Sequence, residues 1–194
     1  MEIVRIKDCD SNFINEIIAA GGKNAHLCFS CGTCTGGCPA SFAMDYTPRQ
    51  VIRMAGLGMR DKVLRSEAVW YCVSCNTCNT RCPRGVEIPK VMAAIKSIAI
   101  KEGVDVNKSG PAFYTSFSEI VATNGKIFEP MLLLKFALRS ASNVAGAVKY
   151  LIASAPLGIE LIKKGKLHFT PDKIRGRKQL KRIYENVRKM EGAK

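Results

Sequence analysis

Eight of the nine cysteines form two copies of one pattern, C-x2-C-x2-C-x3-C-P. Three thiolates spaced three residues apart can surround one corner of an iron–sulfur cube, and the fourth lies beyond that loop. The proline that follows fixes φ and turns the chain away. The pattern therefore predicts two [4Fe-4S] clusters. The first run is Cys28, Cys31, Cys34 and Cys38 before Pro39, and the second run is Cys72, Cys75, Cys78 and Cys82 before Pro83.

Two other uses of cysteine fit the pattern less well. Structural zinc takes cysteines as separated C-x2-C pairs around a tetrahedral ion, and neither run has that form. Disulfides belong to secreted proteins, but residues 1–8 lack the apolar core of a signal peptide. We therefore expect a cytoplasmic protein whose two runs bind iron. Cys9 belongs to neither run and is interpreted as a free thiol.

The remaining sequence offers no site for converting an organic substrate. It contains no G-x-G-x-x-G unit for a dinucleotide, no P-loop and no C-x-x-C-H haem attachment. No Ser/His/Asp or Cys/His constellation is visible, so no catalytic residue is predicted. The chain is expected to hold and pass electrons without transforming a substrate by itself.

The positive charge is concentrated near the C-terminus. The formal net charge is +14, and residues 163–189 contain eleven Lys or Arg against Asp172 and Glu185. Such a segment can bind nucleic acid, an anionic membrane surface or acidic proteins, or it can be a solvated helix face. Only Phe169 and Tyr184 offer aromatic rings for base stacking. We expect no nucleic-acid partner, although a nucleic-acid-binding protein with structural clusters stays an alternative.

No segment is expected to span a membrane. The longest apolar stretch, residues 131–157, is interrupted by Lys135, Arg139 and Lys149. A spanning helix needs about 20 nearly uncharged residues.

Apolar spacing and capping residues predict a mostly α-helical chain. Thr47 and Pro48 mark a helix start, and a turn through Trp70 and Tyr71 is expected before the second run. Asn124 and Gly125 mark another turn. Helices are expected from a cap at Asp10 or Ser11 to Gly21, from Pro48 to Gly56, over 61–65, from Pro89 to Gly103, and over 112–123, 131–140, 144–153, 157–164 and 176–190.

The two runs resemble those of bacterial-type two-cluster ferredoxins, in which the fourth cysteine of each run ligates the other cluster. The helical pattern between them resembles the α-helical ferredoxins. This resemblance implies an α-helical ferredoxin domain over residues 1–105 and a helical, basic region over 106–194 that docks to partner subunits. It also implies two ligand sets, which are Cys28, Cys31, Cys34 and Cys82 for one cluster and Cys72, Cys75, Cys78 and Cys38 for the other.

Longer stretches resemble the iron–sulfur electron-transfer subunit, of the C type, of heterodisulfide reductase from methanogenic archaea. They are residues 28–39 with their Cys-Gly-Thr-Cys-Thr core, 48–54, Trp70-Tyr71 and 72–86. That family implies a soluble, multisubunit oxidoreductase of methanogenesis. In it, a flavin-containing subunit splits electron pairs and the iron–sulfur subunit relays one stream. A catalytic subunit with CCG motifs, which this chain lacks, then reduces the mixed disulfide of coenzyme M and coenzyme B.

The resemblance leaves the electron donor and one other assembly open. A nickel–iron hydrogenase, a formate dehydrogenase or both supply electrons to the reductases of this family. The bare cysteine pattern also resembles that of succinate dehydrogenase and of glycolate or glycerol-3-phosphate oxidases. An iron–sulfur subunit of a membrane quinone- or phenazine-linked dehydrogenase is therefore the alternative.

Overall fold

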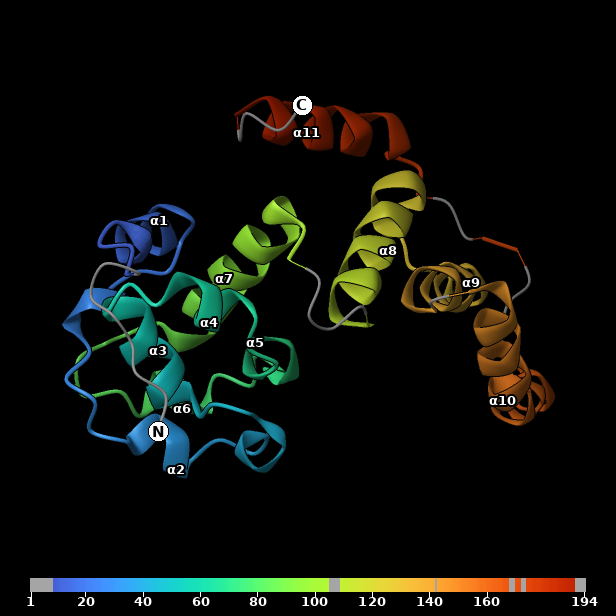
Figure 1. Ribbon diagram of the computed structural model, residues 1–194. Helices are drawn as coiled ribbons and strands as arrows, with labels where there is room; N and C mark the ends of the chain where they lie inside the picture. Colours follow the sequence, from blue (N-terminus) through green and yellow to red (C-terminus); the bar gives the residue numbers. More distant parts are fainter. Residues whose placement is uncertain (1–8, 105–108, 142, 168–169, 172–173, 191–194) are drawn as a thin grey trace. The chain divides into compact units, whose positions relative to one another are not determined.

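The computed structural model describes residues 9–104, 109–141, 143–167, 170–171 and 174–190. Within these ranges every regular element is a helix, which confirms the predicted mostly α-helical class (Figure 1). The chain divides into two compact units, residues 1–107 and 108–194, called here the N-terminal and C-terminal units. Residues 1–8, on which the prediction about a signal peptide rests, lie outside the described residues.

The described part of the N-terminal unit contains both cysteine runs and most of the buried apolar core. Its α-helices are α1 (Phe13–Ala19), α2 (Thr33–Gly36), α3 (Pro48–Gly56), α4 (Arg60–Leu64), α5 (Ala68–Tyr71), α6 (Thr77–Thr80) and α7 (Ile88–Glu102), and its 3-10 helices are η2 (Ala25–Leu27) and η3 (Ser41–Ala43).

Helix α7 is the support on which the N-terminal unit is built. It contacts α1, α3, α4, α5 and α6 (Figure 1). Val91 and Ile95 on its apolar stripe have no exposed surface. The helix begins at Ile88, carries Pro89 in its first turn and ends at Gly103, whose φ of +64° favours glycine. Both ends agree with the prediction from the sequence.

Helix α3 also begins where its capping residues predict. The Gln50 side chain accepts a hydrogen bond from the Thr47 backbone N–H at 2.9 Å, and the two residues form a capping box on either side of Pro48, the first residue of the helix. The apolar face of α3 buries Val51 and Ile52. The opposite face leaves Arg49 exposed beside the first cysteine run.

Arg60 joins three segments of this unit. Its guanidinium pairs with Asp10 at 3.2 Å, with Glu16 of α1 at 2.5 Å and with Glu102 of α7. It also lies over the Phe13 ring, 5.0 Å from the centroid. The hydrogen bonds to Glu16 and Glu102 raise the pKa of Arg60 above its ordinary value. The pairs fix α1 and α7 to the start of α4.

Asp45 connects the segment after the first run to the segment before the second. One carboxylate oxygen accepts hydrogen bonds from the Ser66 hydroxyl at 2.9 Å and the Ala68 backbone N–H at 2.7 Å. The other accepts from the Glu67 backbone N–H at 3.0 Å. These donors lie at the start of α5, so Asp45 caps that helix from a distant part of the chain.

Replacing Asp45 with Ala is expected to lower the free energy of unfolding of the N-terminal unit by about 1–2 kcal/mol, because the start of α5 loses its acceptor. Urea titration followed by the fluorescence of Trp70, the only tryptophan, measures the change directly on α5. Asp61→Ala, which removes an exposed carboxylate on α4, is the matched control. Equal stability of the Asp45 and Asp61 variants would contradict this role.

The described part of the C-terminal unit consists of four helices, α8 packing on α9 and α11, and α9 on α10. Glu119 pairs with Lys135 at 2.8 Å and with Arg139 at 2.7 Å, which joins α8 to α9. The hydrogen bonds from Arg139 and Lys135 lower the pKa of Glu119. The four helices are α8 (Ser109–Asn124), α9 (Glu129–Ser140), α10 (Val144–Lys163) and α11 (Arg177–Met190).

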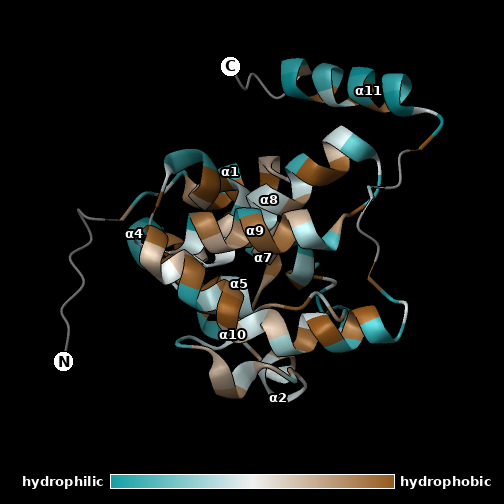
Figure 2. Cartoon of the chain, turned by 90° about the vertical axis from the view of Figure 1, so that its right-hand side faces the viewer, coloured by the Kyte–Doolittle hydropathy of each residue, from teal (hydrophilic) through white to brown (hydrophobic). Residues whose placement is uncertain are grey.

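Helix α10 replaces two predicted helices with one. Helices over 144–153 and 157–164 were expected, but one helix continues through Pro156. It has 20 residues, only 6% of its most apolar window is buried, and it is long and apolar enough to cross a membrane by length and composition (Figure 2). From the sequence, no segment was expected to span a membrane, because Lys135, Arg139 and Lys149 interrupt residues 131–157. Helix α10 begins beyond two of these residues, so that only Lys149 of the three lies within it.

Candidate metal centre

The two cysteine runs fold into loops with the same backbone. Ser30 and Ser74, each two residues after the first cysteine of its run, have φ of 61° and 53°. Gly32 and Asn76 occupy the next matching pair, with φ of 89° and 61°. Glycine and asparagine tolerate this left-handed region best among the residues. Helices α2 and α6 begin directly after them.

The second cysteine of each run has a threonine hydroxyl beside its sulfur. Cys31 Sγ lies 3.4 Å from Thr33 Oγ1, and Cys75 Sγ lies 3.5 Å from Thr77 Oγ1. These side-chain hydrogen bonds, followed by the backbone N–H of the same threonines, lower the pKa of Cys31 and Cys75. A lowered pKa favours the thiolate, which is the form that binds metal.

The third cysteine of each run is more deeply placed. Burial raises the pKa of Cys34, and burial followed by the nearby Cys72 raises the pKa of Cys78 to about 11. A coordinating metal displaces the proton of such a thiol outright. Each loop thus presents an exposed, acidified thiol and a shielded one.

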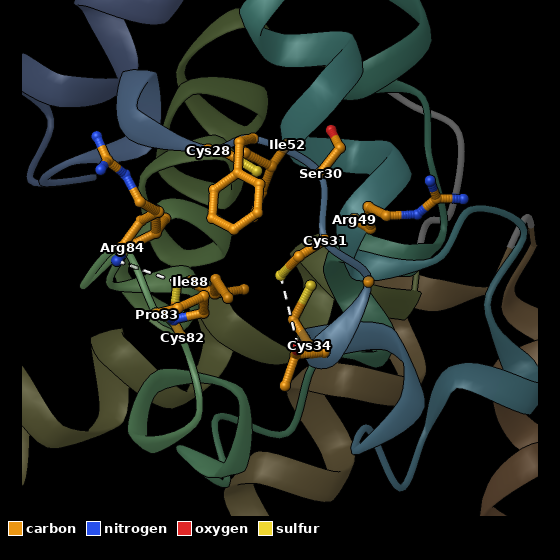
Figure 3. A pocket seen from close by; sticks show the side chains of 14 residues that line it. Cys28, Ser30, Cys31, Cys34, Arg49, Ile52, Cys82, Pro83, Arg84 and Ile88 are labelled. Atoms are coloured by element: carbon orange, nitrogen blue, oxygen red, sulfur yellow. Dashed lines mark hydrogen bonds between the residues drawn. The ribbon is translucent and has the colours of Figure 1, made fainter.

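The first cavity brings together three cysteines of the first run and the last cysteine of the second. It encloses about 350 Å³ of space between atoms, part of it open to solvent. Figure 3 shows Arg49 and Arg84 extending on opposite sides of this cavity. The Val86 backbone N–H donates a hydrogen bond to the Cys82 sulfur at 3.4 Å. The cysteines that line the cavity are Cys28, Cys31, Cys34 and Cys82.

The second cavity has the complementary composition. It encloses about 390 Å³ and is lined by three cysteines of the second run and the last of the first. Ile88, only 2% exposed, lines both cavities and lies between them. The described residues that line the second cavity carry no charge. Its cysteines are Cys38, Cys72, Cys75 and Cys78.

The donor chemistry of both cavities fits an iron–sulfur cluster. Each offers four cysteine sulfurs spread around a space between atoms, and none of the nine cysteines is in a disulfide. Among the described residues, no three His, Cys, Asp or Glu side chains lie close enough together to hold a single metal ion. Cys9 is half-buried and lines neither cavity.

Sequence reasoning missed three residues of this region. Arg49 reaches the first cavity from α3, Ile88 separates the cavities, and Lys96 of α7 donates a hydrogen bond to the Cys72 carbonyl oxygen. Lys96 was visible in the sequence as a lysine inside the apolar stripe of α7. No sequence pattern indicated the roles of Arg49 and Ile88, since those roles depend on how distant segments pack.

Comparison with known proteins places these observations in a family. The 4Fe-4S dicluster domain family matches residues 24–86. The chain is 34% identical over 139 residues to an iron–sulfur subunit of the CoB–CoM heterodisulfide reductase of Methanocaldococcus jannaschii, the second of its C type. The matched segment covers 66% of this chain and 74% of that protein.

Two further relatives carry longer names. The C subunit of the H(2):CoB-CoM heterodisulfide,ferredoxin reductase of Methanothermobacter thermautotrophicus is 42% identical over 52% of this chain and 55% of its own length. The C2 subunit of the H(2)/formate:CoB-CoM heterodisulfide,ferredoxin reductase of Methanococcus maripaludis is 38% identical over 52% of this chain and 59% of its own. The chain therefore spans little more than half of these two relatives.

The shared dicluster domain makes this chain a [4Fe-4S] protein, and its relatives are iron–sulfur subunits of a multisubunit oxidoreductase. The two cysteine loops, the two four-cysteine cavities and the similarity over 74% of the first relative all agree with this conclusion. The chain belongs to the family of heterodisulfide reductase iron–sulfur subunits of the C type.

Proposed function

We propose that this chain is the electron relay of a soluble, cytoplasmic heterodisulfide reductase. It takes electrons from a flavin-containing subunit and passes them to a CCG-motif catalytic subunit, which reduces the CoB–CoM heterodisulfide. The observation that carries the proposal is the pair of four-cysteine cavities separated by Ile88. Two redox centres on either side of one side chain form a path through the protein.

The cavities support a specific ligand assignment. The fourth cysteine of each run lines the same cavity as the first three cysteines of the opposite run. The fourth cysteine of two-cluster ferredoxins has the same place. We therefore assign two clusters. One is held by Cys28, Cys31, Cys34 and Cys82, and the other by Cys72, Cys75, Cys78 and Cys38.

Each cluster supplies a one-electron redox centre, and the chain's own residues set its surroundings. Ile88, Ile52 and Met92 shield the cavities from water. Backbone N–H groups and the threonine hydroxyls beside the sulfurs supply hydrogen bonds that tune a reduction potential. Among the described residues, only the cysteines need to form bonds to a cluster.

The relatives' names support the wider assembly. One names H(2) and another names H(2) or formate together with the heterodisulfide and ferredoxin. We infer a complex with a nickel–iron hydrogenase, a formate dehydrogenase or both as electron donors.

The C-terminal unit is proposed to dock onto partner subunits. Its apolar residues include Leu134 and Leu138 of α9, which are about half exposed, and a groove of about 1180 Å³ lies among α8, α9 and α10. Exposed apolar surface of this extent is typical of a subunit interface. Helix α11 is strongly hydrophilic (Figure 2), and its Lys and Arg residues suit acidic partners.

Each cavity reaches the surface beside a different apolar residue. Phe29 is 60% exposed at the first cavity and Val73 is 69% exposed at the second. Each follows the first cysteine of its run. We infer that one partner approaches each cluster past one of these residues.

Replacing Phe29 or Val73 with Asp is expected to slow electron transfer with one partner at least about tenfold, because a carboxylate repels the reduced clusters and disturbs an apolar contact. The two variants should affect different half-reactions, donor to chain and chain to acceptor, measured by stopped-flow absorbance in the reassembled complex. Leu57→Asp, at an exposed apolar residue that lines neither cavity, is the control. Loss in the same half-reaction from both variants would contradict two separate approaches.

The proposal is tested by isolating the native complex without oxygen. Identification of a flavoprotein and a CCG-motif protein among its subunits, with about eight irons on this chain, supports it, since two cubes need four irons each. Four or fewer irons per chain in fully loaded protein would contradict the proposal.

A second candidate is suggested by α10, because only 6% of its apolar window is buried. An iron–sulfur subunit of a membrane quinone- or phenazine-linked dehydrogenase would keep both clusters and change the partners. Recovery of a haem-containing membrane protein with the chain would favour this candidate over the soluble complex.

A further inference from the structure

Lys96 is a buried cation that contacts one of the proposed cluster ligands. It lies on α7 with only 7% of its surface exposed. Its ammonium donates a hydrogen bond to the backbone carbonyl oxygen of Cys72 at 3.2 Å. Lysine is seldom buried to this degree without a specific interaction, because taking the charge out of water is costly. The charge is therefore held beside the first cysteine of the second run.

The helix that carries Lys96 also forms a wall of the second cavity. Pro89 and Met92 of α7 line that cavity, and Lys96 follows Met92 by four residues on the same helix face. Because the described residues lining the second cavity are uncharged, the ammonium is a localised positive charge next to its rim. The first cavity differs, since its cations Arg49 and Arg84 are exposed to solvent.

We propose that Lys96 is a positioning residue that raises the reduction potential of the cluster held by Cys38, Cys72, Cys75 and Cys78. The inference rests on the ligand assignment in the proposed function. Reduction adds one electron and breaks no bond, so the cluster gains one unit of negative charge. A fixed cation stabilises that charge, and burial protects the interaction from screening by salt. The exposed arginines at the first cavity are screened more strongly.

A purely structural role for Lys96 makes a different prediction. If Lys96 serves only to hold the structure together, for example through its hydrogen bond to the Cys72 carbonyl, its loss changes the free energy of unfolding and leaves both reduction potentials unchanged. Reduction potentials therefore separate the two roles, and a comparison of charged with neutral replacements separates charge from hydrogen bonding.

The test uses the full chain, reconstituted with iron and sulfide without oxygen, and a dithionite titration followed by EPR. Lys96→Met removes the charge at similar length, Lys96→Gln keeps a hydrogen-bond donor without charge, and Lys96→Arg keeps the charge. Lys101→Met, at an exposed lysine of the same helix, is the matched control. Both neutral variants should lower one of the two potentials by at least about 59 mV, a tenfold change for one electron, and leave the other nearly unchanged. The Arg and Lys101 variants should match the parent.

Each other outcome is decisive. Unchanged potentials in a neutral variant that carries both clusters would overturn the role of Lys96 while leaving the relay intact. Equal shifts of both clusters would also overturn it, because the effect would not be local. Loss of a cluster in both neutral variants would overturn it as well, by placing Lys96 in the folding of the site. A parent chain that never binds two clusters would instead defeat the proposed function.

Discussion

A chain in which Cys28, Cys31, Cys34 and Cys82 are all replaced with Ala is expected to keep one intact [4Fe-4S] cluster and about four irons. The reason is that these four cysteines line one cavity, so their removal leaves the four sulfurs of the other cavity in place. Iron analysis and the EPR signal of the dithionite-reduced protein measure the outcome.

The matched control removes the same number of cysteines by sequence instead of by cavity. Replacing Cys28, Cys31, Cys34 and Cys38 with Ala takes a ligand from both cavities, and no complete set of four remains. This variant should not hold a full [4Fe-4S] cluster. The reverse result, with the control retaining a cluster and the cavity variant losing both, would show that each run ligates its own cluster.

Removal of iron by a chelator is expected to release both cysteine loops while α3 and α7 stay folded. Helices α2 and α6 have four residues each, far below the length at which a helix is stable alone, and Cys34 is the only residue of either that is buried. Metal ligation contributes on the order of 10 kcal/mol in comparable small metal sites. Amide hydrogen exchange over 28–38 and 72–85 should become roughly 100-fold faster.

The C-terminal unit supplies the internal reference for that measurement. Helices α8 and α9 carry no cysteine, so their exchange should not change when iron is removed. Loops that remain as protected without iron as with it would contradict the dependence of their fold on the clusters.

Local signals account for the parts of the fold that the sequence predicted well. Thr47 and Gln50 form a capping box around Pro48 within four residues, and Gly103 ends α7 in the left-handed conformation it favours. The mostly α-helical class follows from these signals and from the apolar spacing. None of them requires knowledge of how distant segments pack.

Two elements differ from the prediction. Separate helices over 144–153 and 157–164 were expected, yet α10 is one helix that continues through Pro156, and no packing contact at Pro156 among the described residues explains its continuity. The turn expected at Trp70 and Tyr71 is the end of α5, whose start is capped by Asp45 from 23 residues away. A cap that distant leaves no local pattern.

Some residues of the site could also be recognised from the sequence, and others could not. The eight cysteines were recognisable because their spacing is fixed by the geometry of a cluster. The residues that distinguish the two cavities were not, because Arg49 and Lys96 reach them from α3 and α7 through the packing of the unit. Differences between the two clusters are therefore expected to come from residues outside the cysteine runs.

Freeze-quench EPR of the native complex during turnover tests the relay most directly. Mixing with the electron donor should produce the reduced signals of both clusters, and adding the CoB–CoM heterodisulfide should remove both at a rate no slower than turnover. If either cluster keeps one oxidation state while the heterodisulfide is consumed, electrons bypass it and the chain is not the relay.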